Sequence, residues 1–249
     1  MKNRLFRALG LFGILVSLYF VTYTGQFIST DEIILLDAAH SFYFYHNLDL
    51  TYSTNLRPFV TLPPDRVGAS LDSEPLQAYF SAPLLWIAAH VPGIGMVQTT
   101  LLINVFLTAL TAVVLYYYGV ALGYTDATAL TIALVFGTAT IAWPYSRFYF
   151  REPLFTLMAL TGAYALERWR AKIEAGHIRP NLLLLAGGAL VLAFLSKEAS
   201  LLVLPTLLII AFPHFQINRR TVIELGIGLM LVLIAILIAL ITGIASRSL

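Results

Sequence analysis

Long apolar segments, separated by short polar or charged ones, make up most of this 249-residue chain. A helix that crosses a lipid bilayer needs about 20 predominantly apolar residues, with a range of roughly 17–25. Seven segments approach or reach this length, although the fifth and sixth are short: 8–28, 97–119, 127–143, 153–167, 181–195, 200–212 and 221–243. Their repetition along the whole chain predicts a bundle of membrane-spanning helices.

The scarcity of charge supports the same fold class. Charged residues make up 11% of the chain and hydrophobic residues 59%, whereas a soluble domain carries about 25% charged residues. We therefore predict an all-α polytopic membrane protein with about seven transmembrane helices, forming one membrane domain over 1–249. The absence of cysteine excludes disulfides, thiolate metal sites and thiol catalysis. A net charge of +2 is too small to indicate nucleic acid as a partner.

The distribution of Lys and Arg predicts the orientation, because cytoplasmic loops carry the excess of positive charge. The deciding segment is 76–90, which is apolar but short and interrupted by proline. If it does not span, nine of the 15 Lys and Arg residues lie on the cytoplasmic side; if it spans, only seven do. We therefore predict an interfacial or re-entrant helix there, a cytoplasmic amino terminus and an extracytoplasmic carboxyl terminus. The first apolar segment resembles a secretory signal, but its length predicts an uncleaved helix.

One long outer loop, 29–98, is predicted to carry function. It holds seven of the 13 acidic residues, namely Asp31, Glu32, Asp37, Asp49, Asp65, Asp72 and Glu74. Loops longer than about 15 residues are usually functional or disordered. Within it, 31–46 is predicted to be a helix capped by Thr30. Ile33, Leu36, Ala39 and Phe42 or Phe44 are expected to form an apolar stripe that lies on the membrane surface.

Three groups of ionisable residues are predicted at the outer membrane edge, where such groups are costly and often functional. They are Asp31 with Glu32, Arg147 with Arg151 and Glu152, and Lys197 with Glu198. A carboxylate can accept the proton of a hydroxyl or amine, and cations can stabilise a departing phosphate. The pattern therefore predicts group transfer from a phosphate-linked lipid. The alternatives are a helix cap, a structural ion pair and a lysine that extends to the headgroups.

A run of small residues within 181–195 predicts close helix packing. Gly187 and Gly188 stand among Ala186, Ala189 and Ala193. Small residues allow membrane helices to approach closely. We expect this face, including Gly188, to pack on another helix of the chain.

Three sequence blocks carry a family resemblance. They are Ser29-Thr30-Asp31-Glu32, then Tyr145-Ser146-Arg147 with Arg151-Glu152, and the glycine-rich segment 187–198 that ends in Ser196-Lys197-Glu198. In their order and spacing the chain resembles the amino-terminal membrane module of GT-C glycosyltransferases, nearest the protein O-mannosyltransferase and aminoarabinose-transferase type.

The resemblance implies transfer of a sugar from a polyprenyl-phosphate donor with inversion at the anomeric carbon. It implies that Asp31 is the catalytic base, that Glu152 lines the acceptor side, and that the donor phosphate is bound by Lys197, Arg151 and Arg147. Glu32 and Glu198 are secondary candidates. Some members carry a divalent metal, but no histidine here maps onto a ligand position, so no metal residue is predicted.

Members of this family usually continue with further helices and often a soluble outer domain. This chain stops after its seventh predicted helix, so we expect it to be a truncated relative, to receive the missing parts from a partner, or to have lost catalysis. The alternative function is a non-catalytic membrane subunit that packs against other membrane proteins. Membrane lipids are expected partners in either case.

Overall fold

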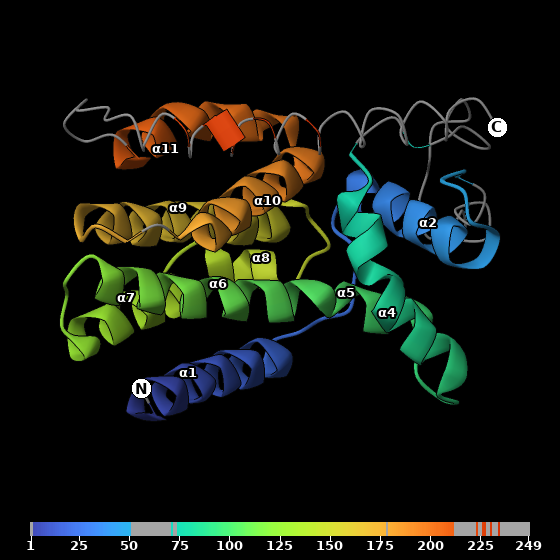
Figure 1. Ribbon diagram of the computed structural model, residues 1–249. Coiled ribbons are helices and arrows are strands. Elements are labelled where there is room, and N and C mark those ends of the chain that lie inside the picture. The colour runs from blue at the N-terminus through green and yellow to red at the C-terminus, as the bar shows by residue number, and fades with distance from the viewer. Residues whose placement is uncertain are drawn as a thin grey trace.

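The computed structural model describes residues 2–50, 71, 74–177 and 179–211, together with 223, 226, 227, 230 and 234. Regular secondary structure in these residues is helical throughout, which confirms the predicted all-α class. The bundle is formed by α1 (Lys2–Val21), α6 (Ile103–Ala121), α7 (Asp126–Ala139), α9 (Glu152–Glu174) and α10 (Pro180–Ser196). As Figure 1 shows, α6 lies inside this bundle; it packs on α1, α7 and α9, and α10 packs on α9.

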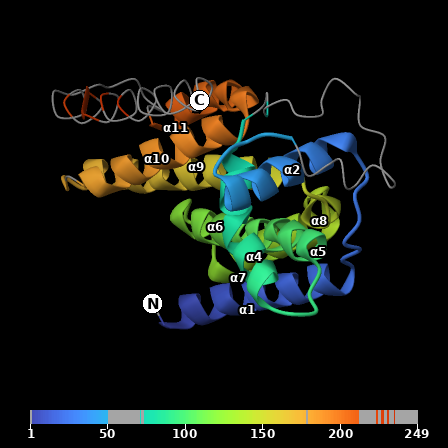
Figure 2. The ribbon, with the colours of Figure 1, turned by 90° about the vertical axis from the view of Figure 1, so that its right-hand side faces the viewer.

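Two further helices, α2 (Thr30–Tyr45) and α4 (Leu76–His90), lie at the end of the bundle away from the amino terminus (Figure 1). They pack on each other, and α5 (Met96–Leu101) joins α4 to α6. The turned view in Figure 2 shows that α4 crosses the direction of the bundle helices instead of extending it. The remaining elements are α8 (Ala142–Ser146), a 3-10 helix (Glu198–Val203) and α11 (Leu204–Ala211).

Within the described residues, two helices are long and apolar enough to cross a membrane, namely Lys2–Val21 and Met96–Ala121. The second comprises α5 and α6. Helix α7, helix α10 and the stretch Glu198–Ala211 are apolar but shorter. Each predicted segment between 97 and 212 overlaps a helix, although 127–143 crosses the break between α7 and α8, and the described part of 200–212 consists of the 3-10 helix and α11. The predicted segment 221–243 lies outside the described residues apart from the five separate positions, so seven crossings stay a prediction.

Two helix ends differ from the predicted ones, and local backbone contacts explain why. Helix α1 ends at Val21 instead of residue 28, and the chain turns toward α2 at Gly25, whose φ of 62° glycine adopts without steric cost. The cap of α2 is Ser29, not Thr30. Its hydroxyl accepts the N–H of Glu32 at 3.4 Å while the Glu32 carboxylate accepts the N–H of Ser29 at 3.0 Å. This reciprocal capping box satisfies two backbone donors that a threonine one residue later does not reach.

The first three residues of the predicted apolar stripe of α2 face the protein, not the membrane surface. Ile33, Leu36 and Ala39 are all buried, whereas Phe42 is half-buried and Phe44 is exposed. Leu36 packs in a cluster with Leu101 of α5, and Ala39 packs in a cluster with residues of α4. These three residues therefore form the contact by which α2 attaches to the rest of the chain.

The contact between α9 and α10 follows the small residues, but at different positions from the one expected. Ala186, Ala189 and Ala193 of α10 are buried, at the spacing of one helix face. On α9, a Cβ at Gly162 would lie 2.9 Å from Leu190 Cδ2. The prediction that Gly188 lies in this contact is wrong: no described atom lies within 4 Å of its ideal Cβ position, because residue 188 is off that face.

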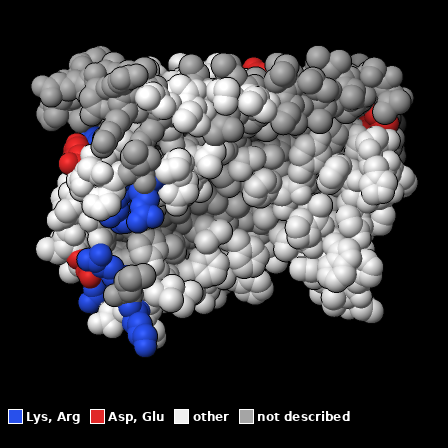
Figure 3. All heavy atoms as spheres, in the orientation of Figure 1, with Lys and Arg blue, Asp and Glu red and all other residues white. Residues whose placement is uncertain are grey.

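Basic side chains gather at the end of the bundle where α1 begins (Figure 3). There Asp126, the first residue of α7, pairs with Arg4 Nε at 2.9 Å and with Arg7 Nη1 at 2.8 Å. Near the end of α9, Arg170 pairs with Glu167 at 2.6 Å. On the face shown in Figure 3 the helix flanks are largely free of charge, and the charged side chains lie toward the ends of the bundle.

Candidate functional site

The segment 147–152, which links α8 to α9 and ends with Glu152 as the first residue of α9, is the structural centre of the site. Asn104 of α6 donates from Nδ2 to the carbonyl oxygens of Phe148 at 2.5 Å and Phe150 at 2.8 Å. Asn104 is fully buried, and its own Oδ1 accepts a hydrogen bond from Gln77 Nε2 of α4 at 3.0 Å. The carbonyl groups of this non-helical segment are thus satisfied inside the protein, as buried backbone requires.

Glu32 attaches the start of α2 to the same segment. Its side chain is fully buried. The carboxylate accepts the N–H of Ile28 at 2.7 Å and of Ser29 at 3.0 Å, and its other oxygen accepts the N–H of Tyr149 at 2.6 Å. Hydrogen bonds to an ionised acceptor are roughly twice as strong as neutral ones. Glu32, a secondary candidate from sequence, therefore lies where it holds backbone, not where it meets a substrate from solvent.

Tyr149 extends this attachment to α4. Its hydroxyl lies 2.5 Å from the hydroxyl of Ser81, and both residues are fully buried. Burial raises the pKa of the Tyr149 hydroxyl, while the hydrogen bond with Ser81 acts in the opposite direction. Tyr149 is consequently neutral at physiological pH and acts as a hydrogen-bonding group.

Asp31 occupies the first turn of α2 and is exposed, in contrast to its neighbour Glu32. A carboxylate in the first turn is favoured by the helix dipole. Because Glu32 is bound to the N–H of Tyr149, the backbone next to Asp31 is attached to the segment that leads into Arg151 and Glu152. The structure thus presents a solvent-accessible carboxylate on a rigid backbone at this end of the bundle.

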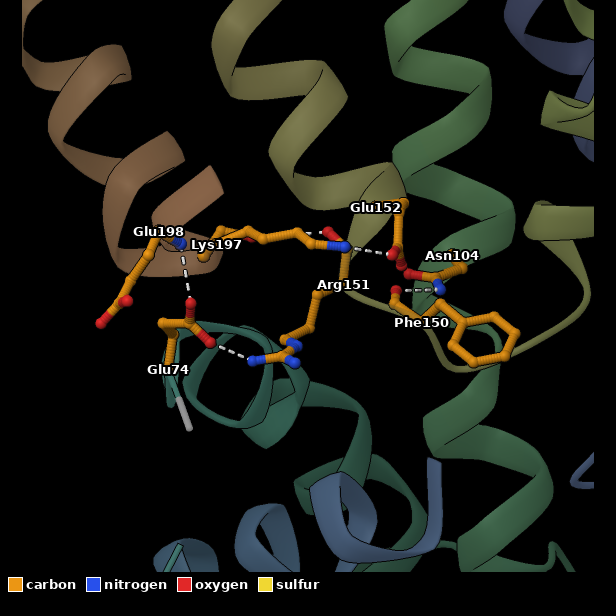
Figure 4. A network of polar contacts seen from close by, with 8 residues as sticks. Glu74, Asn104, Phe150, Arg151, Glu152, Lys197 and Glu198 are labelled. Carbon is orange, nitrogen blue, oxygen red and sulfur yellow. Dashed lines mark hydrogen bonds and ion pairs between the residues drawn. The ribbon is translucent and has the colours of Figure 1, made fainter. Parts of the chain in front are cut away.

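A network of ion pairs joins three parts of the chain at the same end (Figure 4). Lys197 Nζ donates to Glu152 Oε1 at 2.6 Å. Arg151 Nη1 pairs with Glu74 Oε2, and the other oxygen of Glu74 accepts the N–H of Glu198 at 2.7 Å. The four charged side chains are between 20% and 35% exposed, so water can reach the network without surrounding it.

The remaining two candidates lie outside these pairs. The Glu198 carboxylate is exposed and points away from the network, to which this residue contributes its backbone N–H (Figure 4). The guanidinium of Arg147 stands over the ring of Phe148, with its Cζ 5.7 Å from the ring centroid. The structure therefore brings Arg151, Glu152 and Lys197 together, and gives Arg147 a different neighbour.

Sequence reasoning did not select four residues that build the site: Glu74, Gln77, Ser81 and Asn104. The last three are polar positions within apolar helices, and such positions in a membrane helix are expensive unless they are bonded inside the protein. That signal was available from the sequence. Glu74 stands directly before Pro75 and the apolar segment 76–90, and nothing in its local sequence indicates its partners.

No cluster of three or more metal-ligating side chains occurs in the part of the chain that the structure describes. The chain matches no protein-family model, no curated protein and no solved structure.

Proposed function

We propose that the protein is a membrane glycosyltransferase of the GT-C type, which transfers a sugar from a polyprenyl-phosphate donor to an acceptor on the outer face. The observation that carries this proposal is the arrangement around Glu32. Its buried carboxylate attaches the helix start that exposes Asp31 to the segment that bears Arg151 and Glu152. A proton acceptor and cations suited to phosphate thus belong to one end of the bundle.

In the proposed orientation, the basic end of the bundle lies in the cytoplasm and the end with α2 and α4 lies outside. The gathering of Lys and Arg where α1 begins supports this orientation (Figure 3). Helix α4 crosses the bundle direction, as a helix in the membrane plane should (Figure 2). Large apolar side chains of α1, such as Phe6 and Phe20, are exposed and suit contact with lipid.

The proposed reaction uses each charged group for one step. Asp31 takes the proton of the acceptor hydroxyl or amine while the acceptor atom attacks the anomeric carbon. The bond from that carbon to the phosphate oxygen breaks, and the prenyl phosphate leaves with the bonding electron pair. Lys197 and Arg151 stabilise the charge on the departing phosphate. Glu152 holds Lys197 in position through their ion pair.

Asp31→Asn tests the base. In nanodiscs supplied with polyprenyl-phosphate mannose or polyprenyl-phosphate aminoarabinose, release of prenyl phosphate should fall by about 10²–10⁴-fold, the usual contribution of a general base. Donor binding should stay near the wild-type level, because asparagine keeps the shape of the side chain.

The matched control is Asp126→Asn, which makes the same charge change at the other end of the bundle. It should leave turnover unchanged. Wild-type turnover in the Asp31→Asn variant would show that this carboxylate is not the base.

The second candidate function is a non-catalytic membrane subunit of a larger complex. One observation favours it: Lys197 and Arg151 already have carboxylate partners within the chain, Glu152 and Glu74. Purified protein that binds no prenyl phosphate would make the subunit the better interpretation.

A further inference from the structure

Glu74 occupies the position in the network that an anionic ligand needs. Its two carboxylate oxygens bridge the Arg151 guanidinium, at the start of α9, and the N–H of Glu198, after the end of α10 (Figure 4). Two oxygens of a phosphate can make the same pair of contacts, because guanidinium and backbone N–H groups donate to phosphate as they do to carboxylate. Lys197 adds a second cation next to this position.

We propose that Glu74 is a built-in competitor of the donor phosphate, and that its carboxylate must leave Arg151 before the phosphate binds. This inference rests on the proposed function and adds a residue to it. Glu74 selects for ligands whose phosphate can displace it, and an uncharged prenyl alcohol cannot do so.

The charges of the network favour displacement over addition. Arg151 and Lys197 carry two positive charges, and Glu74 and Glu152 carry two negative ones. The phosphate of a polyprenyl-phosphate sugar is a diester with one negative charge, and the prenyl phosphate that leaves is a monoester with about −1.5 to −2 charges at neutral pH. Either phosphate gains little Coulomb energy beside all four side chains, because their net charge is zero. A phosphate that replaces Glu74 meets Arg151, Lys197 and Glu152, whose net charge is +1.

Of the two carboxylates, Glu74 is the one that can withdraw. Glu152 is the first residue of α9 and is followed by Pro153, so its backbone belongs to a long helix. Glu74 lies outside helical structure, two residues before α4 begins. A change in its backbone or side-chain torsions breaks the contacts with Arg151 and Glu198 and leaves α4 intact.

Glu74→Gln is the decisive variant, since glutamine keeps an acceptor oxygen for the Glu198 N–H and removes the charge that holds Arg151. Decaprenyl phosphate in nanodiscs should bind about fivefold more tightly than to the wild type, the order of magnitude expected from losing one partly exposed competing ion pair. If Glu74 only held the site together, Glu74→Gln would instead weaken the binding of decaprenyl phosphate, because the substitution would disorder the site.

Asp126→Asn, with the same charge change far from the network, should leave binding unchanged. Decaprenol should bind equally to wild type and Glu74→Gln. Tighter binding of inorganic phosphate to Glu74→Gln would support the same competition for a free anion. Unchanged or weaker binding of both phosphates would overturn the role of Glu74. Absence of prenyl phosphate binding in every protein would overturn the proposed function as well.

A measurement on the wild type covers the case in which Glu74→Gln does not fold. Saturating decaprenyl phosphate should speed hydrogen exchange at the Glu74 and Leu76 amides, because the contacts that hold this stretch are released. Unchanged or slower exchange there, with the ligand bound, would contradict displacement of Glu74.

Discussion

At the scale of single residues, two adjacent carboxylates differ in their exposure to solvent. Asp31 and Glu32 both belong to the first turn of α2, yet Asp31 is exposed and Glu32 is fully buried. Successive residues of an α-helix point about 100° apart, so one of the pair can face the protein while the other faces solvent. The backbone N–H groups around Glu32 determine which one does so.

Glu32→Gln should destabilise the fold. The amide group has one acceptor oxygen, so at least one of the N–H groups now bound by the carboxylate loses its partner. Loss of charge-assisted hydrogen bonds in a buried position costs about 2–4 kcal/mol. Thermal unfolding in detergent should show a clearly lower Tm.

Asp31→Asn is the control for this substitution, because it makes the same chemical change at an exposed neighbour. Its Tm should stay close to the wild-type value. Equal effects of the two substitutions would contradict the structural role assigned to Glu32.

At the scale of helices, polar side chains hold α2 and α6 to the segment 147–152, whereas apolar and small side chains hold the bundle helices together. Asn104 and Glu32 bind the segment 147–152 from α6 and α2. In contrast, α9 and α10 approach each other where Gly162 leaves room for Leu190. The two regions should therefore respond differently to changes in side-chain volume.

Gly162→Leu should lower the Tm in detergent, whereas Gly188→Leu should not. The Cβ of a leucine at 162 would lie 2.9 Å from Leu190 Cδ2, and overpacking of this kind typically costs about 1–3 kcal/mol. The same side chain at 188 points into open space. Equal loss of stability in both variants would show that α10 packs with another face.

The helices were largely predictable from sequence, and their contacts were not. Apolar segments located α4, α6 and α10 within a few residues, because burial or lipid contact requires apolar side chains over a whole helix. Glu74 contacts Arg151 and Glu198 across 77 and 124 residues of chain. No local pattern encodes such a separation, so the acidic residue that completes the network was not distinguishable from its neighbours in the loop.

At the scale of the molecule, the proposed orientation can be tested with cysteine labelling, which the chain suits because it has no cysteine of its own. Ala175 and Ala199 are both exposed and lie beyond opposite ends of α10, Ala175 in the turn after α9 and Ala199 in the 3-10 helix that begins at Glu198. In intact cells an impermeant maleimide should label Ala199→Cys, and it should label Ala175→Cys only after the membrane is made permeable.

The reverse labelling pattern would mean that 76–90 spans the membrane and that every later turn lies on the other side. Labelling of both cysteines from outside would show that the cells leak. A signal from wild-type protein, which has no thiol, sets the background.

The hydrogen bond between Glu32 and Tyr149 also has a consequence for biosynthesis. The two residues are 117 positions apart, and at about 5–20 residues per second roughly 6–23 s pass between their synthesis. During that interval one oxygen of the carboxylate lacks its native donor, and α2 lacks its attachment to the segment 147–152. In the proposed orientation, α2 lies on the extracytoplasmic surface of the membrane without this hydrogen bond during that time. A chaperone or a protease can reach it there before the third and fourth predicted spanning helices, 127–143 and 153–167, are inserted.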